Sequence, residues 1–297
     1  MRQASVGVPV ATLWSAPDRT RPSDTAASRD TPDIGAWIAA MTPDEQTGSS
    51  VVTQALLGEE VLVEQDHSDG WSRVLLPAQP SAGLDPRGYP GWIRTAHLTA
   101  PATDGTRLVI DAMSTTLARS PGGPVVVPGV VLGTVLTPAG PADRGWLPVH
   151  VAGHAEPLWA PEDDLALLPS RPPTGDEALA VARRLLGATY VWGGLSTLGV
   201  DCSGLVHLVW RRLGVTLPRD AHDQAAATTA VPPGDERLGD LFFFARPGSR
   251  VHHVGIVVTP AGATPARLLH AAPGAHRVVE EPMPAQRTET LAGTHRP

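Results

Sequence analysis

The sequence predicts a multidomain protein in which two small all-β barrels are followed by a domain of mixed α and β structure. Three observations support this prediction. The chain has 297 residues, which is enough for two or three domains of ordinary size. Its 31 prolines and 30 glycines are spread throughout, and this favours short strands and turns over long helices. The strongest helix signals come only after a proline-rich stretch at 169–173.

Residues 1–100 carry short apolar runs separated by turn residues, the pattern expected of strands in a small barrel. The expected strands are residues 8–14, 60–64, 71–76 and 91–93. Between the first two, the stretch 18–48 is polar and proline-rich apart from 34–41, for which we expect one short helix. We therefore predict a first domain at 1–100 that carries a long insertion.

Residues 101–170 repeat this pattern and are predicted to form a second small barrel. The expected strands are residues 108–113, 125–131, 135–136, 146–151 and 158–160. Glycine and proline separate these runs, so each strand is expected to be short.

The third predicted domain spans residues 171–297 and begins after the proline-rich linker. Apolar residues at helical spacing predict a helix over 176–186, with Thr174 as its N-cap and Gly187 at its end. A second helix is expected from Cys202 or Ser203 to Leu213. The strands expected after it are residues 241–244, 254–258 and 268–270.

Composition narrows the class of protein. The chain is 42% hydrophobic, which is enough for a buried core. Its formal charge of −7 argues against a nucleic-acid or anionic-membrane partner. No stretch approaches the length of a membrane span, and the N-terminus lacks the features of a secretory signal. If Met1 is the native start, we expect a cytoplasmic protein; otherwise it would be secreted or associated with the cell wall. The oligomeric state is left open.

The chain contains one cysteine, Cys202. This excludes a disulfide framework and any zinc site that needs two thiolates, and we expect no cofactor. A lone cysteine is more often a small buried hydrophobic residue than a nucleophile. Cys202, however, follows a glycine-rich turn and opens a predicted helix, where free N–H groups and the helix dipole favour the thiolate. This position makes Cys202 a candidate nucleophile.

A cysteine nucleophile needs a base, and two adjacent histidines stand at the start of an apolar strand. Because neighbouring strand residues point to opposite faces, only one of His252 and His253 can face the cysteine. His270 ends the next expected strand and could orient the base. Taken singly, His252 is more simply read as a solvated strand end and His270 as a core histidine.

Six motifs in order turn these separate signals into a resemblance. They are YVWGG at 190–194, DCSGLV at 201–206, LPR at 217–219, GDLFFF at 239–244, HVGI at 253–256 and HA at 270–271. Together they resemble the NlpC-type bacterial cell-wall peptidases, a papain-like α+β family with a Cys-His-His triad. The resemblance covers about 174–297 and implies that Cys202 is the nucleophile, His253 the base and His270 the orienting residue.

The same resemblance implies a substrate pocket. Tyr190 matches a tyrosine near the oxyanion site, and Trp192 in the same motif is assigned to substrate binding. Asp201 and Ser203 match positions that line the pocket.

The first domain adds to this resemblance. TQALLGE at 53–59, Trp71 and GYPGW at 88–92 look like the first SH3-like domain of γ-D-glutamyl-L-diamino-acid endopeptidases, in which two SH3-like domains precede the catalytic one. The resemblance implies that Tyr89 narrows the cleft and that Asp220 helps to hold the N-terminal amine of the substrate. Val52 and Ala221 stand where an acid and a serine would be expected, which weakens the expected selection for a free N-terminal L-Ala.

These observations predict a cysteine endopeptidase that hydrolyses the γ-D-Glu–diamino-acid bond of murein-derived peptides, in cell-wall peptide recycling. Three alternatives remain. The chain could be an inactive module that binds peptides or the cell wall, or an amidase or acyltransferase with the same triad. A metal hydrolase built on His252, His253 and His270 would leave Cys202 without a role, and we expect no metal.

Overall fold

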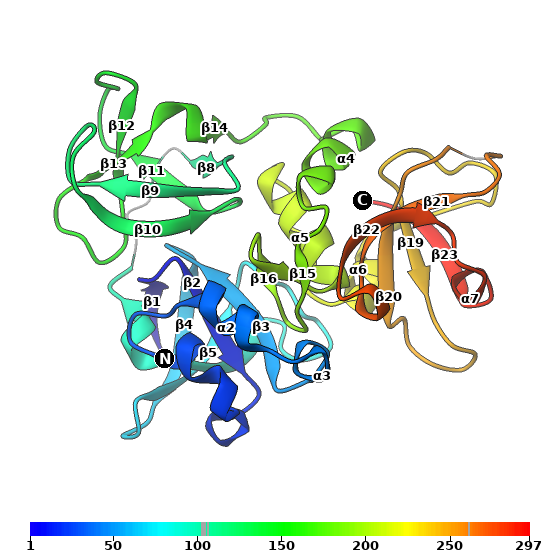
Figure 1. Ribbon diagram of the computed structural model, residues 1–297, viewed down its shortest axis with the longest axis horizontal. Helices are drawn as coiled ribbons and strands as arrows, with labels where there is room; N and C mark the ends of the chain where they lie inside the picture. Colours follow the sequence, from blue (N-terminus) through cyan, green and yellow to red (C-terminus); the bar gives the residue numbers. More distant parts are fainter. Residues whose placement is uncertain (102–104, 106, 261) are drawn as a thin grey trace.

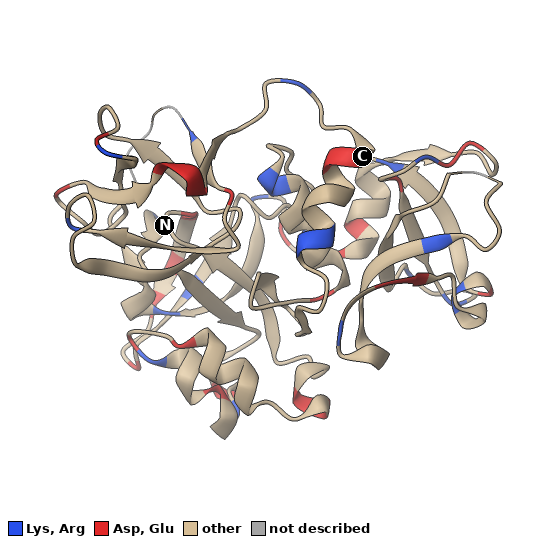
Figure 2. Ribbon diagram, turned by 45° about the horizontal axis from the view of Figure 1, so that its top comes forward, with Lys and Arg blue, Asp and Glu red and all other residues tan. Residues whose placement is uncertain are grey.

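The computed structural model describes residues 1–101, 105, 107–260 and 262–297. These residues form three β-sheets, which follow one another along the chain (Figure 1). The protein is therefore a mostly-β multidomain chain, as predicted. Acidic and basic residues are scattered over all three parts (Figure 2). In the described part of the chain, no helix has the length and apolar character needed to cross a membrane.

The first sheet has seven strands in the order β3-β2-β6-β5-β4-β1-β7. The strands are β1 (Arg2–Val6), β2 (Val10–Trp14), β3 (Val51–Leu56), β4 (Glu60–Asp66), β5 (Trp71–Leu76), β6 (Tyr89–Arg94) and β7 (Leu98–Thr99). Alternate residues such as Ala4, Val61, Val74 and Ile93 fill its core. Strands β1 and β3 were not expected from the sequence, although the strands predicted at 8–14, 60–64, 71–76 and 91–93 are all present.

The insertion between β2 and β3 holds three short helices, α1 (Thr25–Ser28), α2 (Ile34–Ala40) and α3 (Pro43–Gln46). Helix α2 is the one predicted. Helix α3 begins at a capping box in which Thr42 and Glu45 satisfy each other's backbone N–H groups. Trp37 is fully buried and donates from Nε1 to Asp24, 2.8 Å away. The insertion is thus a packed structure rather than a polar loop with one helix.

The second sheet also has seven strands, in the order β10-β9-β13-β12-β11-β8-β14. They are β8 (Leu108–Ile110), β9 (Ser114–Ala118), β10 (Val125–Val131), β11 (Val135–Pro138), β12 (Trp146–His150), β13 (Leu158–Pro161) and β14 (Leu165–Leu167). Of the run predicted as one strand at 108–113, only Leu108–Ile110 forms a strand, β8, which pairs with β11 and β14. Strand β9 begins after that run, at Ser114, and pairs with β10 and β13.

The third part combines a nine-stranded sheet with helices α4 (Gly175–Arg184), α5 (Cys202–Arg212), α6 (Ala221–Ala227) and α7 (Ala285–Thr288). The sheet order is β16-β17-β15-β22-β21-β20-β19-β23-β18. Its strands are β15 (Thr189–Tyr190), β16 (Leu195–Ser196), β17 (Gly199–Val200), β18 (Thr229–Val231), β19 (Leu241–Phe244), β20 (His253–Val257), β21 (Arg267–Ala272), β22 (Arg277–Pro282) and β23 (Leu291–Arg296).

Both predicted helices are confirmed. Helix α4 starts at a capping box between Thr174 and Glu177, and Gly187 beyond its end has a positive φ of 85°. Helix α5 begins at Cys202, and every residue from there to Trp210 is buried. In Figure 1 this helix lies in the middle of the molecule, between the third sheet and the other two. One apolar cluster runs from Trp14 and Leu56 of the first sheet through α5 to Val254 of β20.

Candidate active site

Cys202 is the first residue of α5, and the turn before the helix is built around Asp201. The Asp201 carboxylate accepts hydrogen bonds from the backbone N–H of Gly204 (2.6 Å) and of Gly193 (2.8 Å). A Cβ on Gly204 would lie 2.2 Å from the carbonyl oxygen of Gly194, so the helix can approach the glycine-rich turn only with glycine at this position. This close packing fixes the place of Cys202.

The two buried histidines lie on neighbouring strands beside this helix. The Nε2 atom of His253, at the start of β20, is 2.7 Å from Nδ1 of His270 on β21. The Cys202 sulfur receives hydrogen bonds from the backbone N–H groups of Ser203 and Val254, and Val254 directly follows His253. The structure thus gathers Cys202, His253 and His270 at one place, although 68 residues separate Cys202 from His270. His252 is exposed.

Burial controls the protonation of these groups. It raises the pKa of the Cys202 thiol to about 12, an effect that the negative charge of Asp201 increases. Burial also lowers the pKa of His253 and of His270. The helix start was expected to favour a thiolate, but in the free site the loss of hydration outweighs the two N–H groups that face the sulfur. The favoured pair is a neutral thiol and a neutral imidazole.

Tyr190 and Trp192 lie on either side of Val191, before the glycine-rich turn. Tyr190 is buried, and burial, together with negative charge on Cys202 and Asp201, raises the pKa of its hydroxyl. The Trp192 side chain is 44% exposed. Its backbone N–H donates to the carbonyl of Gln46 (2.8 Å), so the insertion of the first sheet contacts this part of the site.

Arg219 holds both Asp201 and Ser203. Its guanidinium lies 2.9 and 2.8 Å from the two Asp201 oxygens and 3.1 Å from the Ser203 hydroxyl. The same group reaches the first sheet, donating to the Thr53 hydroxyl at 2.8 Å. Arg219 is only 1% exposed. Asp201 and Ser203 therefore belong to a buried polar network, and the sequence analysis gave Arg219 no role in it.

Tyr89 and Asp220 meet across the contact between the first sheet and the third part. The Tyr89 hydroxyl lies 3.2 Å from each oxygen of the Asp220 carboxylate. Burial raises the pKa of Asp220, and the nearby Arg219 opposes this rise. Val52 is half-buried on β3, and Ala221 is buried at the start of α6. Trp92, by contrast, packs its ring against His67 at 4.7 Å between ring centres.

Two charged side chains near the histidines were missed by the sequence analysis. The Glu281 carboxylate on β22 lies 3.0 Å from Nε2 of His270. Arg287 on α7 lies over the ring of Phe244, with Cζ 5.3 Å from the ring centre. No strand was predicted at 277–282, because charged residues flank its two valines and leave no continuous apolar run. Pairing of this segment with β21 was therefore invisible in the sequence.

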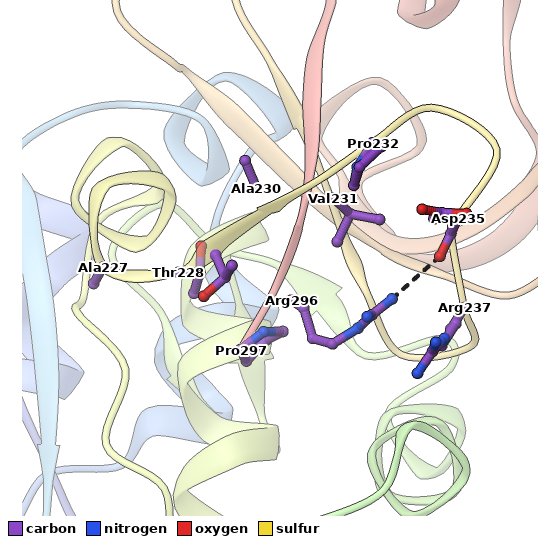
Figure 3. A pocket seen from close by; sticks show the side chains of 10 residues that line it. Ala227, Thr228, Ala230, Val231, Pro232, Asp235, Arg237, Arg296 and Pro297 are labelled. Carbon is purple, nitrogen blue, oxygen red and sulfur yellow. Dashed lines mark hydrogen bonds between the residues drawn. The ribbon is translucent and has the colours of Figure 1, made fainter.

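Two other features involve side chains outside the Cys202–His253–His270 group. Among the residues that the structure describes, Asp220, His222 and Asp223 form a group of possible metal ligands, since one ligand atom of each lies within 4.8 Å of the others. A cavity of about 400 Å³ opens beside β18 and the end of β23, where Arg296 contacts Asp235 (Figure 3). Its lining includes none of the site residues predicted from the sequence.

Comparison with known proteins adds independent findings. Residues 187–292 match the profile of the NlpC/P60 family. The gamma-D-glutamyl-L-lysine dipeptidyl-peptidase of Bacillus subtilis strain 168 is 35% identical over 257 residues, with 84% of each chain covered. A protein of the same name from Bacillus cereus is 30% identical over 302 residues, covering 94% of this chain and 85% of that one.

Among solved structures, that of an NlpC/P60 family protein from Bacillus cereus superposes with a TM-score of 0.89 at 28% sequence identity. The superposition covers 99% of both chains, so the similarity extends over all three sheets.

Proposed function

The chain belongs to the NlpC/P60 family, and from this premise we propose that it is a cysteine peptidase that cleaves the γ-D-Glu–diamino-acid bond of murein-derived peptides. Relatives named as gamma-D-glutamyl-L-lysine dipeptidyl-peptidases over most of the chain support hydrolysis of peptidoglycan peptides. The observation that carries the catalytic part is the arrangement of Cys202 at a helix start beside His253, which is itself joined to His270 at 2.7 Å.

The proposed reaction follows from these contacts. On substrate binding, His253 takes the proton of the Cys202 thiol, and the sulfur attacks the γ-carbonyl carbon. We assign stabilisation of the resulting oxyanion to the backbone N–H groups at the start of α5 and to Tyr190. His253 then gives its proton to the leaving amine as the C–N bond breaks. Water, deprotonated by His253, hydrolyses the thioester and returns the thiol.

The substrate-binding part of the proposal rests on the first sheet. Tyr89 and Asp220 form a polar pair between that sheet and the third part, and Asp220 is an acceptor suited to a substrate ammonium group. Trp192 is exposed beside the glycine-rich turn at Gly193 and Gly194, and its ring can cover the bound peptide. Asp201 and Ser203 would shape the pocket rather than bind the peptide directly, because the hydrogen bonds from Arg219 already engage both side chains.

The finer assignments are part of the same proposal. Residues 1–100 and 101–170 are assigned as SH3-like domains and residues 171–297 as a papain-like catalytic domain. A first domain that closes one end of the cleft would admit small soluble peptides, and this suits cytoplasmic recycling of cell-wall peptides. Whole sacculi should then be digested far more slowly than a free tripeptide.

The direct test is incubation with L-Ala-γ-D-Glu-meso-diaminopimelate and with its L-lysine analogue, followed by mass spectrometry. The expected products are L-Ala-γ-D-Glu and the free diamino acid. A chelator should leave the rate unchanged, whereas a thiol-alkylating reagent should abolish it. The control is Cys202→Ala. Binding of both peptides without cleavage would identify a binding module, and loss of activity in chelator that zinc restores would identify a metal hydrolase.

A further inference from the structure

The Glu281 carboxylate forms a hydrogen bond with His270, one member of the buried histidine pair. We propose that Glu281 is a positioning residue: its carboxylate holds His270, and through it His253, in the tautomers that leave one nitrogen of His253 free to take the Cys202 proton. The proposal rests on the proposed function and adds a fourth member to its catalytic group.

The register of the sheet explains why Glu281 can reach His270. Strands β21 and β22 are antiparallel, with His270 opposite Val279 and Leu268 opposite Glu281. Glu281 and Val279 are two residues apart and so lie on one face, which is the face of His270. Diagonal neighbours of this kind are within reach of long side chains. The resulting contact is 3.0 Å between Nε2 of His270 and Oε1 of Glu281.

The tautomers follow from the chemistry of the three groups. An ionised carboxylate can only accept a hydrogen bond, so Nε2 of His270 carries the proton. In neutral His270, Nδ1 is then an acceptor, and the hydrogen in the 2.7 Å contact must belong to Nε2 of His253. Neutral His253 is therefore left with a lone pair on Nδ1. Through His270, the Glu281 carboxylate thus determines that Nδ1 of His253 is the nitrogen that can act as a base.

Charge gives Glu281 a second effect on the same pair. When His253 takes the thiol proton, a positive charge forms in a buried site, which is costly without a nearby negative group. Around His270, Glu281 from β22 raises the histidine pKa, whereas Arg287 from α7 lowers it. Around His253, the groups that lower the pKa are Arg287, His270 and His252. Glu281 thus opposes the surrounding positive charges.

Neighbouring Glu280 provides a matched control. It lies on the opposite face of β22, where it pairs with Arg183 at 2.9 Å and with Arg267 at 3.6 Å. Glu280 and Glu281 therefore have the same side chain on the same strand, but only Glu281 contacts the histidine pair. The Glu281 side chain is 38% exposed, so a small anion from solvent can enter the space that its removal would leave.

The experiment compares Glu281→Ala with Glu280→Ala on the tripeptide substrate. We expect Glu281→Ala to lower kcat about 10–100-fold with little change in KM, the range found when a carboxylate that orients a metal-ligating histidine is removed. Without Glu281 the pKa of the histidine pair falls, so the acid limb of the kcat/KM profile should move to lower pH. Acetate or formate should restore part of kcat, whereas chloride at equal ionic strength should not. Glu280→Ala should match the wild type.

A second readout keeps this test separate from the proposed function. The rate of Cys202 alkylation by iodoacetamide needs no substrate, and in Glu281→Ala it should fall at neutral pH because the imidazolium that accompanies the thiolate is less stable. If the wild type cleaves no tripeptide, the proposed function fails, but alkylation still tests Glu281. Alkylation and pH profiles equal to those of Glu280→Ala would overturn the proposal. So would a loss of kcat that acetate does not restore and that follows a lowered Tm.

Discussion

The guanidinium of Arg219 forms two short hydrogen bonds, of 2.9 and 2.8 Å, with the two oxygens of Asp201, the residue directly before Cys202. The same carboxylate caps α5 through the N–H of Gly204. One buried ion pair therefore ties the start of the helix that carries the thiol to the glycine-rich turn. Because Arg219 also donates to Thr53, the pair connects this site to the first sheet.

From this contact we predict that Arg219→Met destabilises the protein strongly. The substitution leaves the Asp201 carboxylate buried without its partner, which typically costs about 3–5 kcal/mol of unfolding free energy. Chemical denaturation measures the change. Arg171→Met is the control, since Arg171 pairs with Glu177 on the surface, where its side chain is 59% exposed, and its loss should change stability little. Equal effects of the two substitutions would contradict the structural role of Arg219.

Cys202→Ala and Cys202→Ser should each remove nearly all turnover, by about 10⁴-fold or more in kcat, as loss of a catalytic nucleophile does. Both replacements are small and fit the buried position, so the Tm should stay close to that of the wild type. Steady-state hydrolysis of the tripeptide and thermal unfolding are the measurements. A Cys202→Ala protein that retains its rate would show that the thiol is not the nucleophile.

The two adjacent histidines should differ sharply in their contribution to activity. His253 is 2% exposed and lies 2.7 Å from His270, so His253→Ala should abolish turnover. His252 is exposed and outside β20, so His252→Ala should change kcat/KM by less than about twofold, as surface substitutions usually have small effects. Kinetics on the two variants decide between them. The opposite result would mean that His252, and not His253, faces Cys202.

Acid sensitivity should arise in part from His207, which lies on α5 and is buried with Nδ1 2.7 Å from the carbonyl of Leu217. Burial lowers the pKa of His207 to about 3. A lowered pKa in the folded state means that the stabilisation is present above pH about 6.5 and is lost as the pH falls towards about 3. His207→Gln removes this titration while keeping a side chain that can hydrogen-bond.

The difference in unfolding free energy between the wild type and His207→Gln should therefore shrink on acidification, by at most about 1.4 kcal/mol per pH unit. Urea denaturation at several pH values measures this difference. The other buried histidines titrate in both proteins and cancel in the comparison. A difference that does not change between pH 7 and pH 4 would contradict the assignment.

Selection for a free N-terminal amine should be present but modest. Asp220 offers one carboxylate to the amine, while Val52 and Ala221 offer none of the polar groups expected there. We expect kcat/KM for the free tripeptide to exceed that for its N-acetylated form by about 10-fold, the low end for one hydrogen bond between charged groups. Tyr89→Phe should reduce the ratio, because the Tyr89 hydroxyl contacts both Asp220 oxygens.

The ratio should also fall in acid, since burial raises the pKa of Asp220 and the carboxyl must be ionised to hold an ammonium group. Parallel progress curves on the two peptides between pH 4 and pH 7 measure it. Equal rates on both forms at all pH values would remove Asp220 from amine binding.

Local patterns were sufficient for the elements that carry the nucleophile. The capping residues and apolar spacing predicted α4 and α5, and the position of Cys202 at the start of α5 followed from Asp201 and the glycines around it. Helices and their caps depend on residues a few positions apart, so the sequence states them directly. The same holds for the adjacent histidines before an apolar strand.

What the sequence could not state is which side chains meet across strands and between sheets. Glu281 reaches His270 because of the β21–β22 register, Arg219 reaches Thr53 across 166 residues, and Tyr89 reaches Asp220 across 131. The protonation of Cys202 is a further case, because a helix start favours the thiolate while burial, known only from the tertiary packing, favours the thiol. The sequence by itself determined the chemical groups of this site, and the tertiary structure decided their partners and their charge, because hydration and long-range contacts exist only once the chain is packed.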